Sequence, residues 1–76
     1  SLHLLFIDVQ SRSIFHISSS QPGVWSQPQP VIENIQGSWV RGSVHHDASG
    51  SPVYGFVFDA GSTGGSGFNR YFALPL

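Results

Sequence analysis

Short runs of apolar residues, many of them alternating with polar residues, occupy most of this 76-residue chain. Two runs, Leu4–Val9 and Val53–Ala60, are apolar at odd and even positions alike, apart from one Asp in each. Strands that are covered on both sides have this composition. No segment repeats with the 3.6-residue period of a helix, so the pattern predicts an all-β protein of antiparallel strands.

Polar segments divide the chain into its expected strands. They predict hairpins at Val9–Ser13 and His46–Val53, and a further turn near Gly23. Pro28 and Pro30 cannot donate a backbone hydrogen bond, so the strand before them should lie at a sheet edge or end there. The predicted strands are Leu4–Val9, Ser13–Ser18, Val24–Gln27, Ser38–His46, Val53–Ala60 and Phe68–Leu74. Val31–Gly37 is a predicted connector. Gly61–Gly67 is expected either to be flexible or to be held open so that another group can approach its backbone.

Two segments of the chain repeat one another. Leu5–Val9 and Phe56–Ala60 both read as three apolar residues, an Asp and a small apolar residue, and each is followed by a polar turn and another strand. The two aspartates, at positions 8 and 59, are 51 residues apart. A period near 50 with several strands per unit is typical of β-propeller blades.

Composition excludes several classes of partner. Charged residues make up 9% of the chain, lysine is absent and the net charge is -1, so we expect no nucleic-acid or membrane partner. No apolar run approaches the roughly 20 residues that span a bilayer, and the first residues lack the basic start of a signal peptide. There is no cysteine, hence no disulfide and no cysteine-containing metal site.

The segment Ser38–His46 carries the densest chemistry. Strand alternation puts Trp39, Arg41, Ser43 and His45 on one face and Val40, Gly42, Val44 and His46 on the other. An arginine fork recognises carboxylates, and a nearby histidine exchanges protons near neutral pH, which together suit a sugar acid. The structural alternative is that Arg41 pairs with a carboxylate such as Asp47 and that the histidines bind backbone groups.

Other kinds of site are disfavoured. His45 and His46 point to opposite faces, and His45 with Asp47 would supply too few ligands for a structural zinc, so we expect no metal and no cofactor. The chain has no Gly-x-Ser-x-Gly nucleophile elbow between a strand and a helix. Thr63–Gly67 follows one strand, precedes another and lacks lysine, so it is not a phosphate loop.

The stretch Phe15–Pro28 resembles the Asp-box turn of sialidase-type β-propellers, although this copy lacks the Asp. A strand enters a serine-rich turn, passes Gly23 and meets Trp25 followed by Ser26-Gln27-Pro28. In such a turn, hydroxyl groups bond the backbone, glycine relieves the corner and the aromatic residue fills the space beneath. The alternative is an ordinary polar hairpin turn with a buried tryptophan.

Three further segments, Trp39–Asp47, Tyr54–Gly61 and Gly65–Tyr71, resemble Asp-box propellers that act on polysaccharides. The group they are most similar to is seven-bladed and contains ulvan lyases, rhamnose–glucuronate lyases and rhamnosidases. The resemblance implies about one and a half blades, with residues 1–30 ending one blade and residues 38–76 forming most of the next. Blades bury their faces against neighbouring blades, so we expect other copies or the remainder of a propeller as partners, and no free monomer.

The same resemblance implies a secreted protein that cleaves a uronate-containing polysaccharide by lyase or glycosidase chemistry. In such lyases a His or Tyr removes the proton beside the uronate carboxylate, which an Arg neutralises. Carried over, Arg41 is the neutraliser, His45 the base and Tyr54 or Tyr71 the acid, while Trp39, His46 and Arg70 contact the carbohydrate. The alternatives are a sugar-binding lectin propeller and a small self-associating β domain without a site.

Overall fold

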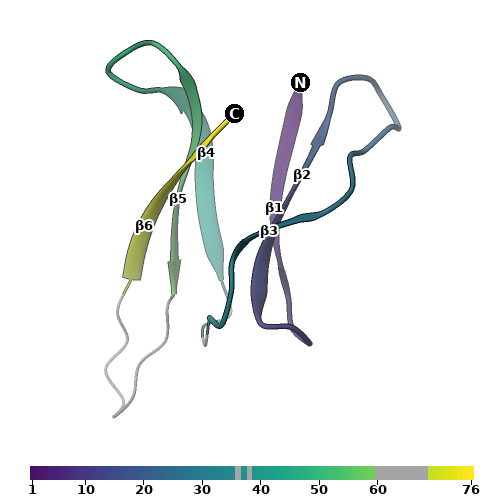
Figure 1. Ribbon diagram of the computed structural model, residues 1–76, viewed down its shortest axis with the longest axis vertical. Helices are drawn as coiled ribbons and strands as arrows, with labels where there is room; N and C mark the ends of the chain where they lie inside the picture. Colours follow the sequence, from purple (N-terminus) through teal and green to yellow (C-terminus); the bar gives the residue numbers. More distant parts are fainter. Residues whose placement is uncertain (36, 38, 60–68) are drawn as a thin grey trace.

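The computed structural model describes residues 1–35, 37, 39–59 and 69–76 (Figure 1). These residues form β-strands and turns and contain no helix, which confirms the predicted all-β class. The strands are β1 (Leu2–Asp8), β2 (Ser13–Ser19), β3 (Gln29–Ile32), β4 (Val40–His46), β5 (Pro52–Asp59) and β6 (Asn69–Pro75). Ser38, Ala60, Gly61–Gly67 and Phe68, which we expected to extend strands or form a flexible loop, lie outside the described residues.

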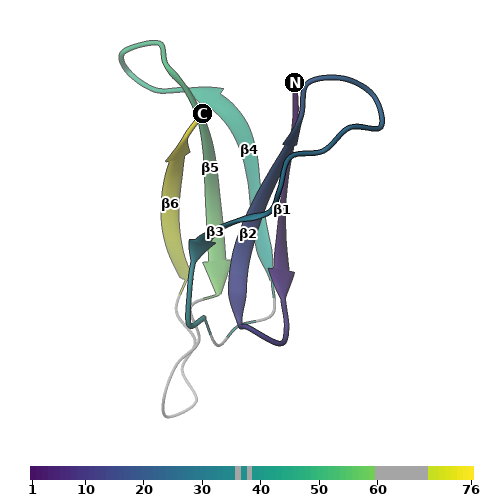
Figure 2. The ribbon, with the colours of Figure 1, turned by 45° about the vertical axis from the view of Figure 1, so that its right-hand side comes forward.

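The strands form two three-stranded sheets in which every neighbouring pair is antiparallel. The first sheet has the order β1-β2-β3 and the second β4-β5-β6. Both predicted hairpins are present, closing where Asp8 pairs with Ser13 and where His46 pairs with Pro52. The sheets stand side by side with β1 next to β4 (Figures 1 and 2). This arrangement is consistent with about one and a half blades.

The hydrophobic core lies between the two sheets. Ile14 of β2 and Phe56 of β5 are completely buried, and the Phe56 ring lies 5.5 Å from the Phe72 ring of β6. Successive residues of a strand point to opposite faces, so each sheet gives one of its two faces to this core. The buried cluster is Ile14, Ile35, Phe56 and Phe58, with Leu5, Ile7, Val31, Ile32, Val40, Tyr54, Phe72 and Leu74 packed against it.

The third strand differs from the prediction. The expected strand Val24–Gln27 is absent; Val24 makes only an isolated bridge to Gln21, and the strand is Gln29–Ile32. The reason is a pair of hydrogen bonds between Ser18 and Ser26: the Ser26 N–H donates to the Ser18 carbonyl (2.8 Å) and the Ser26 hydroxyl accepts from the Ser18 N–H (2.9 Å). These bonds tie Ser26 to the end of β2, and regular pairing resumes only beyond Pro28.

As predicted, proline lies in an edge strand, although this strand is Gln29–Ile32 and not Val24–Gln27. Pro30 lies inside β3, which is the edge strand of the first sheet, and pairs with Phe15. Val31 and Ile32, expected in a connector, also belong to this strand. The true connector begins after Ile32, and its Ile35 is buried, with its N–H donating to the carbonyl of Arg12 at 3.0 Å.

The expectation that Trp25 fills the space beneath the serine-rich turn is wrong. Its side chain is 46% exposed. The turn is instead closed by hydroxyl groups, since Ser26 binds Ser18 and the Ser19 hydroxyl donates to the carbonyl of Gln21 at 2.6 Å. Gly23 has the positive φ (79°) that the corner was expected to need. The turn chemistry is therefore as predicted, but it does not need an aromatic plug.

Because Ile14 is completely buried in the core, shortening its side chain should strongly destabilise the fold. Ile14→Ala should lower the free energy of unfolding by about 2–5 kcal/mol, because the lost methyl groups leave a cavity between the sheets. Val9→Ala is the matched control, since Val9 is 81% exposed, and should change stability by less than about 0.5 kcal/mol. Chemical denaturation of both variants measures the difference, and equal midpoints would contradict the core described above.

Candidate functional site

The face of the second sheet that points away from the core carries candidate chemical groups. Phe56 and Phe58 of β5 point into the core, so Gly55 and Val57 between and beside them lie on the opposite face. The register then places Arg41 opposite Val57 on one side and Tyr71 opposite Val57 on the other. We call this surface the outer face of the second sheet; by the register it contains Arg41, Ser43, His45, Val53, Gly55, Val57, Asp59, Asn69, Tyr71, Ala73 and Pro75.

Gly55 brings two of the predicted residues together. A Cβ atom built on Gly55 would lie 2.5 Å from His45 Cε1 and 2.5 Å from the Tyr71 hydroxyl oxygen. Since both atoms lie so close to one point, they are at most about 5 Å apart. The imidazole and the phenol therefore converge over Gly55, and only a residue without a side chain leaves them this space.

Arg41 lies on the same face, farther along β4. Its Cα is about 13 Å from that of His45, four residues on at about 3.3 Å per residue. Tyr71 is two strands away in the same cross-strand row as Arg41, with Val57 between them. An arginine side chain is long enough to span such a gap, so the patch over Gly55 lies within the reach of Arg41.

The structural alternative for Arg41 is not observed. Asp47 is held within its own turn, where its carboxylate accepts hydrogen bonds from the Ser49 hydroxyl (2.6 Å), the Ser49 N–H (2.9 Å) and the Ser51 N–H (3.0 Å). These bonds, that of the Ser49 hydroxyl above all, hold the pKa of Asp47 below its ordinary value. Within the described part of the chain Arg41 makes no ion pair, so its charge is available to a ligand.

Tyr54 and His46 lie on the other face of this sheet. Tyr54 packs against the core edge-on to Phe56, with ring centroids 6.4 Å apart. The pairing of Val44 with Tyr54 and of His46 with Pro52 puts His46 on that same face, as alternation predicted. Of the two tyrosines proposed as the acid, Tyr71 therefore joins His45 and Tyr54 does not.

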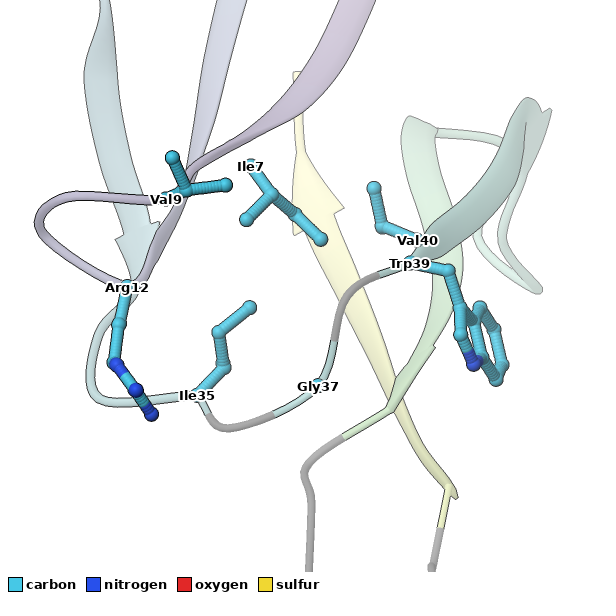
Figure 3. A pocket seen from close by; sticks show the side chains of 7 residues that line it. All are labelled: Ile7, Val9, Arg12, Ile35, Gly37, Trp39 and Val40. Carbon is cyan, nitrogen blue, oxygen red and sulfur yellow. The ribbon is translucent and has the colours of Figure 1, made fainter.

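Trp39 and Arg70 line separate hollows. Trp39 lies at the side of a pocket of about 550 Å³ between the sheets, with Arg12 on the opposite side (Figure 3). Arg70 lies opposite Phe58, hence on the core side, and lines a pocket of about 410 Å³ with Glu33. Arg70 therefore does not belong to the outer face of the second sheet, whereas the Trp39 ring points away from Val40 and Ile7, as predicted (Figure 3). The first pocket is lined by Ile7, Val9, Arg12, Ile35, Gly37, Trp39 and Val40.

Sequence reasoning missed several residues with chemical potential. Gly55 was not recognised, because its importance depends on the registers of β4 and β6 against β5. His3 and His16 were also missed; their side chains share the core face of the first sheet and lie edge-on to Tyr54. Strand alternation could have found this pair only if the first strand had been extended back from Leu4 to include His3.

No comparison with known proteins assigns a family. Searches with protein-family models, among curated proteins and among solved structures each found no match. Among the described residues no three His, Cys, Asp or Glu side chains are grouped so that they could hold a metal ion. That part of the chain also has no helix long and apolar enough to cross a membrane.

The space over Gly55 can be tested without removing any chemical group. Gly55→Ala should keep the fold, because its methyl meets only the far ends of His45 and Tyr71, which can turn aside. Gly42→Ala is the contrasting variant, since its methyl meets the Gly55 carbonyl and the Phe56 backbone and should cost about 1–3 kcal/mol. Denaturation midpoints measure stability, and nuclear Overhauser effects measure the His45–Tyr71 proximity, which should weaken in Gly55→Ala.

Proposed function

We propose that this chain is part of a carbohydrate-active β-propeller, and that the outer face of its second sheet binds and cleaves an acidic, uronate-containing polysaccharide. The observation that carries the proposal is the convergence of His45 and Tyr71 over Gly55, on the face that also holds Arg41. The sequence resemblance to secreted polysaccharide-cleaving propellers supplies the substrate class and the extracellular location.

Each of the three residues has a role in β-elimination. The Arg41 fork binds the uronate carboxylate through two charge-assisted hydrogen bonds, which makes the neighbouring C5 proton more acidic. Neutral His45 takes that proton, the C5 electron pair forms the C4–C5 double bond, and the C4–O bond breaks. The Tyr71 phenol donates its proton to the departing oxygen. An acid and a base at most about 5 Å apart can reach the C5 proton and the neighbouring C4 oxygen from the same side of the sugar ring.

The residue types on this face favour elimination over hydrolysis. Most glycoside hydrolases use two carboxylates that flank the scissile bond. Among the described residues of the three strands, the register places one carboxylate on the outer face, that of Asp59. A lyase needs an arginine, a base and an acid, and this face carries all three, with the base and the acid converging over Gly55.

A lectin function is the second candidate, and the openness of the site favours it. Tyr71 is 60% exposed, whereas electrostatic catalysis is strongest in a site from which water is excluded. In this alternative Arg41 and Tyr71 hold the sugar in the same way but no bond is broken.

Substitutions at Arg41 and His45 distinguish the two functions. Arg41→Lys keeps the charge but loses the fork, and should weaken binding or turnover by about 1.5–3 kcal/mol, roughly 10- to 100-fold. His45→Gln should spare binding and abolish turnover in a lyase, but change little in a lectin. Calorimetry with uronate-containing polysaccharides measures binding, and ultraviolet absorbance of new unsaturated ends measures cleavage.

The control is Arg12→Lys, which makes the same exchange at an arginine outside the outer face. It should leave binding and turnover unchanged. If Arg41→Lys and His45→Gln affect neither quantity, the outer face is not the site.

The proposal also includes a further β-sheet, from another copy or from the rest of a propeller, that covers the outer side of the first sheet. The side of the first sheet away from the core is apolar: Leu2 and Leu4 are 64% and 46% exposed beside the parallel rings of Phe6 and Phe15, whose centroids are 5.6 Å apart. Apolar surface of this kind marks an interface.

Sedimentation velocity tests this part of the proposal. The native preparation should sediment above the 8.2 kDa of one chain, and Leu4→Lys should weaken the assembly because it adds a charge to the apolar face. Val44→Lys, also at an exposed apolar residue but on β4, is the control. A cooperatively folding monomer of the unmodified chain would contradict the expected assembly.

A further inference from the structure

Two histidines on the core side of the first sheet are hydrogen-bonded to each other. His3 Nδ1 lies 3.0 Å from His16 Nε2. The ring centroids are 5.2 Å apart and the ring planes differ by 10°. Since the nitrogens are so much closer than the centroids, the rings lie edge to edge, with one nitrogen directed at the other.

The contact follows from the register of the first hairpin. His3 pairs with Ser18 and Leu5 pairs with His16, so the two histidines are diagonal neighbours on one face of β1 and β2. A neutral imidazole has one N–H and one bare nitrogen, so this contact requires one ring to donate and the other to accept. When both facing nitrogens carry protons, the hydrogen bond is lost and two positive charges oppose each other.

Among the described residues, no carboxylate compensates the charge of this histidine pair. From β5, Tyr54 lies edge-on to both rings, at 6.4 Å from His3 and 6.2 Å from His16. From β4, the register puts His46 on the face that carries Tyr54, and from β3 the uncharged Gln29 pairs with His16. Across the described ranges, no carboxylate is hydrogen-bonded to either ring or paired with it.

We propose that His3 and His16 form a pH-sensitive contact, which holds the β1–β2 hairpin against Tyr54 of β5 at neutral pH and loosens it under mildly acidic conditions. The proposal is independent of the carbohydrate site, because the pair lies on the opposite side of β5 from Gly55. Its physical basis is that the contact accommodates one proton between two facing nitrogens and fails when both are protonated.

The direction of the pH dependence follows from His16. Burial first, and then the charge of His3, lowers the pKa of His16 below the ordinary value of 6.5. The unfolded chain therefore binds more protons than the folded chain once the pH falls below about 6.5. Stability is greatest above that pH, declines as the pH falls through it, and stops declining below the folded-state pKa.

The test uses thermal unfolding of the full 76-residue chain between pH 7.5 and pH 5, together with imidazole ¹⁵N spectra. We expect the unfolding midpoint to fall on acidification, and this fall to be largely removed in His16→Gln, whose amide offers a hydrogen bond but no titration. His46→Gln, which changes a histidine of β4 outside the pair, should retain the full fall.

The imidazole ¹⁵N spectra are recorded on the unmodified chain, so they test the proposal even if a variant does not fold. In the unmodified chain, a coupling between His3 Nδ1 and His16 Nε2 should be present at pH 7.5 and lost at pH 5. His3→Gln provides a second variant with the same expectation as His16→Gln. The proposal is overturned if no such coupling exists at pH 7.5, or if His16→Gln and His3→Gln retain the full fall.

Discussion

The packing of Ile14 and Phe56 between the two sheets determines where every other side chain points. Because strand residues alternate between two faces, burial of Phe56 and Phe58 sends Gly55 and Val57 outward. Arg41 and His45 follow through the register of β4. A slip of one residue would exchange the two faces, so the candidate site depends on the core although none of its side chains is buried there.

The sequence was informative wherever the signal is local. Apolar runs and polar turns predicted both hairpins, and proline predicted an edge strand, because each of these follows from neighbouring residues. The third strand was misplaced and Trp25 was wrongly expected to be buried, since the bond between Ser18 and Ser26 joins residues eight positions apart and leaves no trace in the alternation.

In the candidate site, too, the sequence predicted what depends on neighbouring residues and missed what depends on the pairing of strands. Alternation alone placed Arg41 and His45 on one face, but it could not decide whether Tyr54 or Tyr71 joins them. That choice depends on which residues of β6 pair with β5, and on Gly55 leaving room for both rings. One strand thus separates two groups of proton-exchanging side chains, with Tyr54 facing His3 and His16 and Gly55 lying under His45 and Tyr71.

The free edges of the two sheets have a consequence for how this protein can grow. Each sheet has two edge strands, β1 and β3 in the first sheet and β4 and β6 in the second, and of these β3 and β6 carry Pro30 and Pro75. A proline offers an added strand no N–H, so the β3 and β6 edges resist extension by a further chain, whereas β1 and β4 contain no proline. A further strand can therefore extend either sheet by hydrogen bonds on one side only, at β1 or at β4.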